Sequence, residues 1–115
     1  MFFLKFKKVL FFIIKIIPKF DVYLMIKTIF FMVNITNSSL NKLTVSCGST
    51  VNINKSIMYR LLAKCDGLVN MTNSTILTEL EIRSYSTVSA DLTCYIEFWQ
   101  RDSTATITGT YPWYG

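Results

Sequence analysis

The chain has 115 residues, 51% of them hydrophobic, with twelve Lys and Arg, seven Asp and Glu, three Cys and no His. This length accommodates one small domain with short appendages. The absence of His excludes Ser-His and Cys-His catalytic pairs and removes the commonest zinc ligand, so few routes to catalysis remain.

The net charge of +5 lies in the first thirty residues, which hold six Lys and one Asp. The remainder holds six basic and six acidic residues in scattered positions. A domain that neutralises phosphates needs a clustered basic face. We therefore expect no nucleic-acid partner.

Residues 1–33 form an apolar leader that contains eight of the nine Phe. Its two apolar runs, 9–17 and 22–33, are interrupted by Lys15, Pro18 and Lys27, and neither has the length of a transmembrane span. A basic start followed by apolar residues is typical of a signal peptide. We predict a helical signal peptide that is cleaved near residues 33–39, or a signal-anchor that stays attached.

Two other interpretations of the leader remain open. Translation can begin at Met25, which leaves a shorter leader. Alternatively, the Phe, Ile and Lys bias reflects an AT-rich coding region upstream of the true start.

Five N-glycosylation sequons follow the leader, where chance would give about two. They begin at Asn34, Asn37, Asn54, Asn70 and Asn73. The excess predicts passage through the secretory pathway and a secreted, extracellular glycoprotein. A membrane would be involved only through an uncleaved leader, which is the alternative localisation.

From residue 40 the dominant hydrophobic period is two, which is typical of strands. We expect strands over 43–47, 57–62, 78–83, 92–98 and 105–111, with the last two joined as a hairpin through 101–104. Asp66-Gly67 is a turn signal, and Pro112 ends the last strand. The pattern predicts an all-β, antiparallel β-sandwich. The predicted core is Leu43, Val45, Cys47, Ile57, Tyr59, Leu61, Leu80, Ile82, Leu92, Cys94, Ile96 and Ile107.

The residues before Cys94 then resemble the strand E to strand F region of an immunoglobulin-like domain of the short C2 or I type. Leu80, Ile82 and Tyr85 stand at the family's offsets, and Cys47 lies where strand B has its cysteine. The motif is degenerate, because Leu92 replaces the tyrosine-corner residue and Tyr59 replaces the core Trp. The resemblance implies an immunoglobulin-like domain over residues 34–115 with a Cys47–Cys94 disulfide.

Other cysteine pairings remain open, since three cysteines allow three single pairings. Cys65, Cys94 and Trp99 also resemble the arrangement in some small secreted nematode-type domains, and that pairing would leave Cys47 as the odd thiol. With a Cys47–Cys94 bridge, Cys65 is left to link two chains into a dimer. Three reduced cysteines in an intracellular protein are the third alternative.

The chain shows no constellation for catalysis. Glu79 and Glu81 lie two residues apart on one strand face, and Cys65 has no base to lower its pKa. Glycine-rich phosphate loops, Cys-x-x-Cys pairs and Asp-x-Asp calcium loops are missing from the sequence. We expect no enzyme activity, no cofactor and no metal.

Aromatic residues gather near the carboxyl end of the chain, and such residues dominate binding hot spots. Those considered for partner binding are Tyr95, Trp99, Tyr111 and Trp113. The simpler interpretation is that they cover the end of the domain. We expect a secreted or cell-surface recognition module that binds another protein; the alternatives are a disulfide-stabilised structural or matrix domain, or a fragment of a larger extracellular protein.

Overall fold

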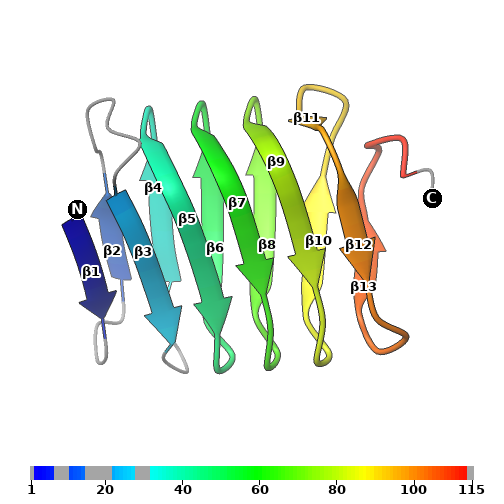
Figure 1. Ribbon diagram of the computed structural model, residues 1–115, viewed down its shortest axis with the longest axis horizontal. Coiled ribbons are helices and arrows are strands. Elements are labelled where there is room, and N and C mark those ends of the chain that lie inside the picture. The colour runs from blue at the N-terminus through cyan, green and yellow to red at the C-terminus, as the bar shows by residue number, and fades with distance from the viewer. Residues whose placement is uncertain (1, 7–10, 15–21, 28–31, 114–115) are drawn as a thin grey trace.

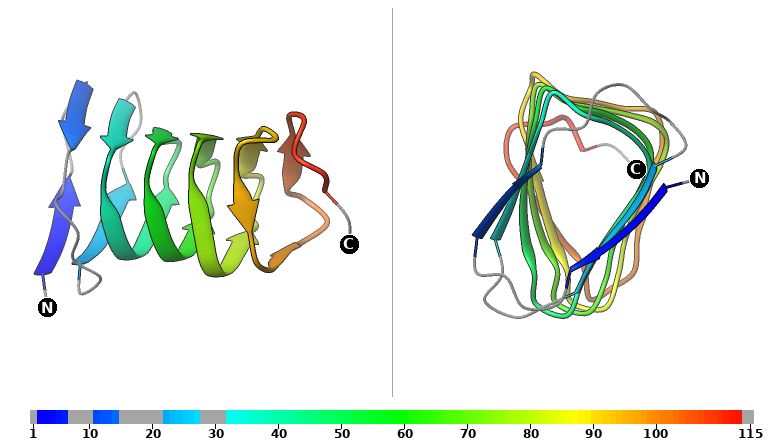
Figure 2. Two further views of the ribbon diagram at one scale, coloured as in Figure 1. Left: turned by 90° about the horizontal axis from the view of Figure 1, so that it is seen from above. Right: turned by 90° about the vertical axis from the view of Figure 1, so that its left-hand side faces the viewer.

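The computed structural model describes residues 2–6, 11–14, 22–27 and 32–113, the first three ranges by their backbone alone. It shows a parallel β-solenoid of about four turns, in which the chain winds repeatedly around one axis (Figure 1). Seen along that axis, the coils lie over one another as a stack of flattened rings (Figure 2).

Two parallel sheets form the walls of the solenoid, and each coil contributes to both. Sheet A contains β1 (Phe2–Phe6), β3 (Val22–Lys27), β5 (Ser39–Ser46), β7 (Ile57–Ala63), β9 (Thr75–Ile82), β11 (Tyr95–Ile96) and β12 (Trp99–Arg101). Sheet B contains β2 (Phe11–Ile14), β4 (Met32–Thr36), β6 (Thr50–Asn54), β8 (Leu68–Thr72), β10 (Thr87–Ala90) and β13 (Thr106–Thr108).

An internal repeat sets the register of the stack. Residues 33–38, 51–56 and 69–74 read Val-Asn-Ile-Thr-Asn-Ser, Val-Asn-Ile-Asn-Lys-Ser and Val-Asn-Met-Thr-Asn-Ser. The ladder pairs Val33 with Val51 and Val51 with Val69, so each coil advances 18 residues and places like residues over like. Repeats of this length are the signature of solenoids, because one coil cannot bury its apolar face alone.

The core is a set of apolar columns between the two sheets. Sheet B contributes one column of Val33, Val51, Val69 and Val88, and another that tapers from Ile35 and Ile53 through Met71 to Ala90. Sheet A contributes the column Leu43, Leu61 and Leu80. All these side chains are at most 2% exposed, and each fully buried aliphatic side chain stabilises the fold by about 1.5–3 kcal/mol.

The corner from sheet B to sheet A uses the last two residues of the repeat. Asn37, Lys55 and Asn73 have φ between 48° and 52°, a left-handed conformation that Asn tolerates well. The buried Ser residues that follow them bond from coil to coil: Ser38 N donates to Ser56 Oγ and Ser56 N donates to Ser74 Oγ, each at 3.2 Å. Ser74 Oγ in turn donates to the Thr72 carbonyl at 2.8 Å. The buried corner backbone is thereby satisfied.

The opposite corner contains two successive left-handed residues in three coils: Cys47-Gly48, Cys65-Asp66 and Ser84-Tyr85. The coils are joined there by backbone bonds, from Gly48 N to the Cys65 carbonyl and from Asp66 N to the Ser84 carbonyl, each 3.0 Å. In the following coil, Asp102 Oδ2 accepts a bond from Ser84 N at 3.1 Å. At this corner the Asp102 carboxylate takes the role that a backbone carbonyl has between the preceding coils.

On the outer face of sheet B, three Asn side chains form a hydrogen-bonded ladder. Asn70 Nδ2 donates to Asn52 Oδ1 at 2.9 Å, and Asn52 Nδ2 donates to Asn34 Oδ1 at 3.0 Å. One column further, Thr72 Oγ1 donates to Asn54 Oδ1 at 3.0 Å. These bonds tie adjacent strands together outside the core.

Aromatic side chains close the carboxyl end of the stack. Trp113 meets Trp99 and Tyr111 edge to face, with ring centroids 5.3 and 4.9 Å apart, and its Nε1 donates to the Thr108 carbonyl. Tyr111 OH lies 3.2 Å from both the N and the O of Ile96. These rings cover the tapered end of the core and the end of sheet B, where an open strand edge would invite pairing with other chains.

The antiparallel immunoglobulin-like sandwich predicted from the sequence is therefore wrong. The predicted hairpin is wrong too, because β11, which lies within the predicted strand 92–98, belongs to sheet A and β13 belongs to sheet B. Alternation with period two is common to parallel and antiparallel strands, so it could not distinguish the two folds. What distinguishes them is the 18-residue repeat.

The predicted Cys47–Cys94 disulfide is also wrong. Cys47 is exposed at a corner, Cys94 is buried between β10 and β11, and no two cysteines lie within disulfide distance. Seven of the predicted core residues are buried and Ile107 is partly buried, whereas Cys47, Ile57, Tyr59 and Leu92 are exposed. Strict alternation mispredicts these four exposed residues as buried, because the chain bends or turns a corner beside them.

Much of the predicted leader, residues 1–33, lies outside the described residues. The described parts of it form β1, β2, β3 and the start of β4, so the expected helix is not found there. β3 pairs in parallel with β5, and β2 pairs in parallel with β4. Whether these residues are removed as a signal peptide stays a prediction.

We expect Asn52→Ala to lower the free energy of unfolding by about 1–3 kcal/mol, because Asn52 makes two ladder bonds and each is worth about 0.5–1.5 kcal/mol. Urea denaturation measures this. Asn70→Ala is the matched control, since it breaks one of those bonds and should cost about half as much. Equal losses in the two variants would contradict the ladder.

Gly109→Ala tests the aromatic end. Gly109 has φ +90°, and an added Cβ would lie 2.1 Å from the Ala90 carbonyl oxygen, so the segment that places Tyr111 must move. We expect tryptophan fluorescence to shift to the red and stability to fall by about 1–3 kcal/mol. Thr110→Ala, at an exposed neighbour, should leave both readouts unchanged; similar spectra for the two variants would contradict the packing described.

Asp102 predicts a pH dependence of stability. Bonds from the Thr104 side chain and from the Ser84 backbone lower the pKa of its carboxyl from the usual 3.8. A group whose pKa is lower in the folded state stabilises the fold above its unfolded pKa, and this stabilisation is lost as pH falls through the folded pKa. The acid side of the unfolding curve should therefore be steeper in the wild type than in Asp102→Asn.

Asp66→Asn is the control for this experiment, because it changes an exposed corner carboxyl and keeps a residue suited to left-handed backbone. Chemical denaturation between pH 2 and pH 7 measures the slopes. Identical acid-side slopes for the wild type and Asp102→Asn would show that this carboxylate does not stabilise the corner.

Candidate recognition face

The two sheets present outer faces of different chemistry. The part of sheet B around the Asn ladder is polar, and Thr residues flank the ladder. Among the described residues, four of the eight exposed large hydrophobic side chains lie on the outside of sheet A strands, and a fifth, Phe98, lies in the link between β11 and β12. They are Ile57, Tyr59, Leu77, Tyr95 and Phe98, between 39% and 54% exposed.

A bend in the strands of sheet A places these residues outside. Leu40, Met58 and Ile76 point inward, and so do Leu43, Leu61 and Leu80 further along the same strands. Between the two inward rows lie at least two consecutive outward residues, such as Tyr59 and Arg60, where the register between β7 and β9 shifts. Strict alternation would have turned one residue of each pair into the core.

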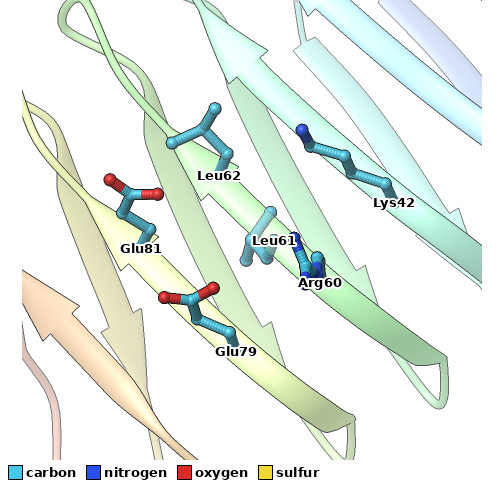
Figure 3. A pocket seen from close by; sticks show the side chains of 6 residues that line it. All are labelled: Lys42, Arg60, Leu61, Leu62, Glu79 and Glu81. Carbon is cyan, nitrogen blue, oxygen red and sulfur yellow. The ribbon is translucent and has the colours of Figure 1, made fainter.

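Charges on the outer face of sheet A are separated by strand. The ladder pairs Lys42 of β5 with Arg60 of β7, and Arg60 with Glu79 of β9. Glu81 lies two residues further along β9, beside Leu62. Figure 3 shows the result: the two basic side chains lie on one side of a shallow hollow of about 40 Å³ and the two acidic ones on the other.

A hydrogen bond and an ion pair hold the acidic side in place. Gln100 Nε2 donates to the Glu79 carboxylate, and Arg83 pairs with Glu81 at 3.4 Å. At the edge of the face, Tyr95 OH donates to the Glu97 carboxylate. That bond and the carboxylate's charge raise the pKa of Tyr95 from 10.0, so its phenol stays neutral and able to donate at physiological pH.

The residues considered for partner binding do not all lie together. Tyr95 is exposed on the outer face of sheet A, whereas Trp99, Tyr111 and Trp113 are partly buried at the end of the stack. Sequence reasoning placed Tyr59 in the core and did not select Leu77, Phe98 or Arg60. An alignment of the 18-residue repeat would have shown consecutive outward positions between the two inward columns. These residues occupy those positions.

All five sequons lie in or beside the sheet B corner, which the repeat generates. Asn37 and Asn73 occupy the exposed left-handed corner position, and Asn54 lies just before it. Asn34 and Asn70 are members of the ladder. The repeat needs Asn and Ser or Thr at these positions for stacking and turning, so it accounts for the excess of sequons without secretion. Their glycosylation stays a prediction.

Within the described ranges, no group of three or more Cys, Asp and Glu side chains could hold a metal ion. No helix in the described part of the chain is both long enough and apolar enough to cross a bilayer.

Cys47 and Cys65 are both exposed, and they lie at the corner that follows sheet A in successive coils.

Comparisons with protein-family models, curated proteins and solved structures found no match.

Proposed function

We propose that this chain is a non-enzymatic recognition module that binds a protein partner through the outer face of sheet A. The observation that supports this is the combination of five exposed large hydrophobic side chains with separated basic and acidic columns on one sheet. Exposed apolar patches rimmed by charge are typical of protein interaction sites. On the outside of strands β4 to β13 of sheet B, whose side chains the structure describes, Met32 is the one exposed large hydrophobic residue.

Catalysis fits the chain poorly. The sequence contains no His, and the hollow between Arg60 and Glu79 holds about 40 Å³, whereas small-molecule sites usually measure about 300–1,000 Å³. A flat face with aromatic and Arg residues suits contact with another folded surface. An extracellular location, as a secreted or surface-attached protein, remains part of the proposal and rests on the leader.

Photo-crosslinking tests the proposal. Phe98 is 54% exposed in the link between β11 and β12 of sheet A, so it can be replaced by benzoylphenylalanine with little change in shape. The labelled protein is irradiated in medium and cell-surface extract from the source organism. We expect discrete protein adducts, identified by mass spectrometry, that Arg60→Glu in the same chain abolishes and Lys55→Glu, at an exposed sheet B corner, does not.

The matched control carries the same probe at Thr106, which is exposed on sheet B. Position 106 should give no discrete adduct. The same adducts at positions 98 and 106, or none at 98, would contradict recognition through sheet A.

A further inference from the structure

We propose that the protein bound by the outer face of sheet A is a second copy of this chain, in a face-to-face dimer with its two-fold axis parallel to the strands and between β7 and β9. This inference rests on the function proposed above and names the partner for that surface. It follows from the order of charges across the sheet.

Symmetry limits how two copies of one face can meet. In a two-fold dimer each contact occurs twice, with residue i against j and j against i. An axis parallel to the strands, between β7 and β9, places β7 over β9 of the other copy and β5 over β12. An axis perpendicular to the strands would instead place each strand over itself and bring like charges together.

The charge order selects the first arrangement. With the axis parallel to the strands, Arg60 of each copy lies opposite Glu79 of the other, because these residues are register partners on β7 and β9. Arg60 and Glu79 belong to the basic and acidic columns, respectively (Figure 3). The opposition therefore allows two ion pairs, whereas the perpendicular axis would place the strands of Lys42 and Arg60 over the same basic strands of the other copy.

The same axis brings two exposed uncharged side chains together, and it sets Leu62 against Glu81. Tyr59 on β7 and Leu77 on β9 are both 39% exposed and exchange places under the rotation, so apolar surface meets apolar surface. Lys42 on β5 comes opposite the start of β12, next to the exposed Phe98. Arg83, which would face Lys64 at the corner, is already paired with Glu81.

The size of the face predicts a weak dimer. Four strand positions at 4.8 Å and eight residues at 3.3 Å give a face of about 19 × 26 Å, or about 500 Å² per copy. A total of about 1,000 Å² is at the lower end of specific interfaces. We expect a dissociation constant on the order of 1–100 μM.

Sedimentation equilibrium of the full chain tests the dimer, with a reducing agent present so that a disulfide through Cys65 does not contribute. We expect a monomer–dimer equilibrium that Arg60→Glu and Glu79→Arg each weaken at least about tenfold, since each replaces two attractive pairs by two repulsive ones. Lys55→Glu should leave the equilibrium unchanged. Circular dichroism shows whether each variant is folded.

The decisive sample is an equimolar mixture of Arg60→Glu and Glu79→Arg. Each variant alone is expected to be monomeric, but their faces carry opposite charges, so the mixture should form a heterodimer about as tight as the wild type. Loss of a charge contact within one chain could not produce this rescue. A wild type that stays monomeric to about 200 μM, or a mixture that stays monomeric, would overturn the self-association.

Failure of this inference is distinguishable from failure of the proposed function. If the wild type is monomeric but the probe at position 98 yields a discrete adduct with a different protein, the recognition face stands and its partner is not a second copy. If neither a dimer nor an adduct forms, both are wrong.

Discussion

The structure depends on register: each coil must advance a whole repeat so that every strand lies over its counterpart. Eighteen residues bring Val over Val, Asn over Asn and Ser over Ser through three coils. A shift by one residue would turn the Val column outward and the Asn ladder into the core, where unpaired amides cost several kcal/mol. Core, ladder and corner therefore enforce one alignment together.

Because register decides the fold, a coil with an inserted residue must keep its inward side chains in line with those of its neighbours. The coil that contains β9 has one extra residue between its inward rows, and the register shift between β7 and β9 absorbs it outside the core. The bend lets two neighbouring residues point outward, which is how Tyr59 and Arg60 come to be exposed together. The surface proposed for recognition is a consequence of how sheet A bends around its core.

The two ends and two faces of such a stack have different requirements. An open end exposes apolar columns and strand edges, and here Tyr111 and Trp113 cover the carboxyl end while Trp99 continues the Leu80 column. On the outside of sheet B, the side chains of Asn34, Asn52 and Asn70 hydrogen-bond to one another. Sheet A has apolar and charged side chains on its outside, which makes it the face with most to gain from a partner.

The sequence by itself determined that the domain is all-β, where strands β5, β7 and β9 of sheet A lie and which of their aliphatic residues alternate into a core, because period-two patterning records burial one strand at a time. The alternation did not identify β4, β6, β8 and β10 of sheet B. Period-two alternation did not determine strand direction, since parallel and antiparallel strands alternate identically; the sequence feature that indicates it is the 18-residue repeat, which sets each hydrogen-bonded partner 18 residues away. Only the tertiary structure decided that Cys47 and Cys94 lie apart, that Trp113 closes an end, and that Arg60 and Glu79 are neighbours. Those relations depend on how the coils stack, and stacking is a long-range property that local pattern does not carry.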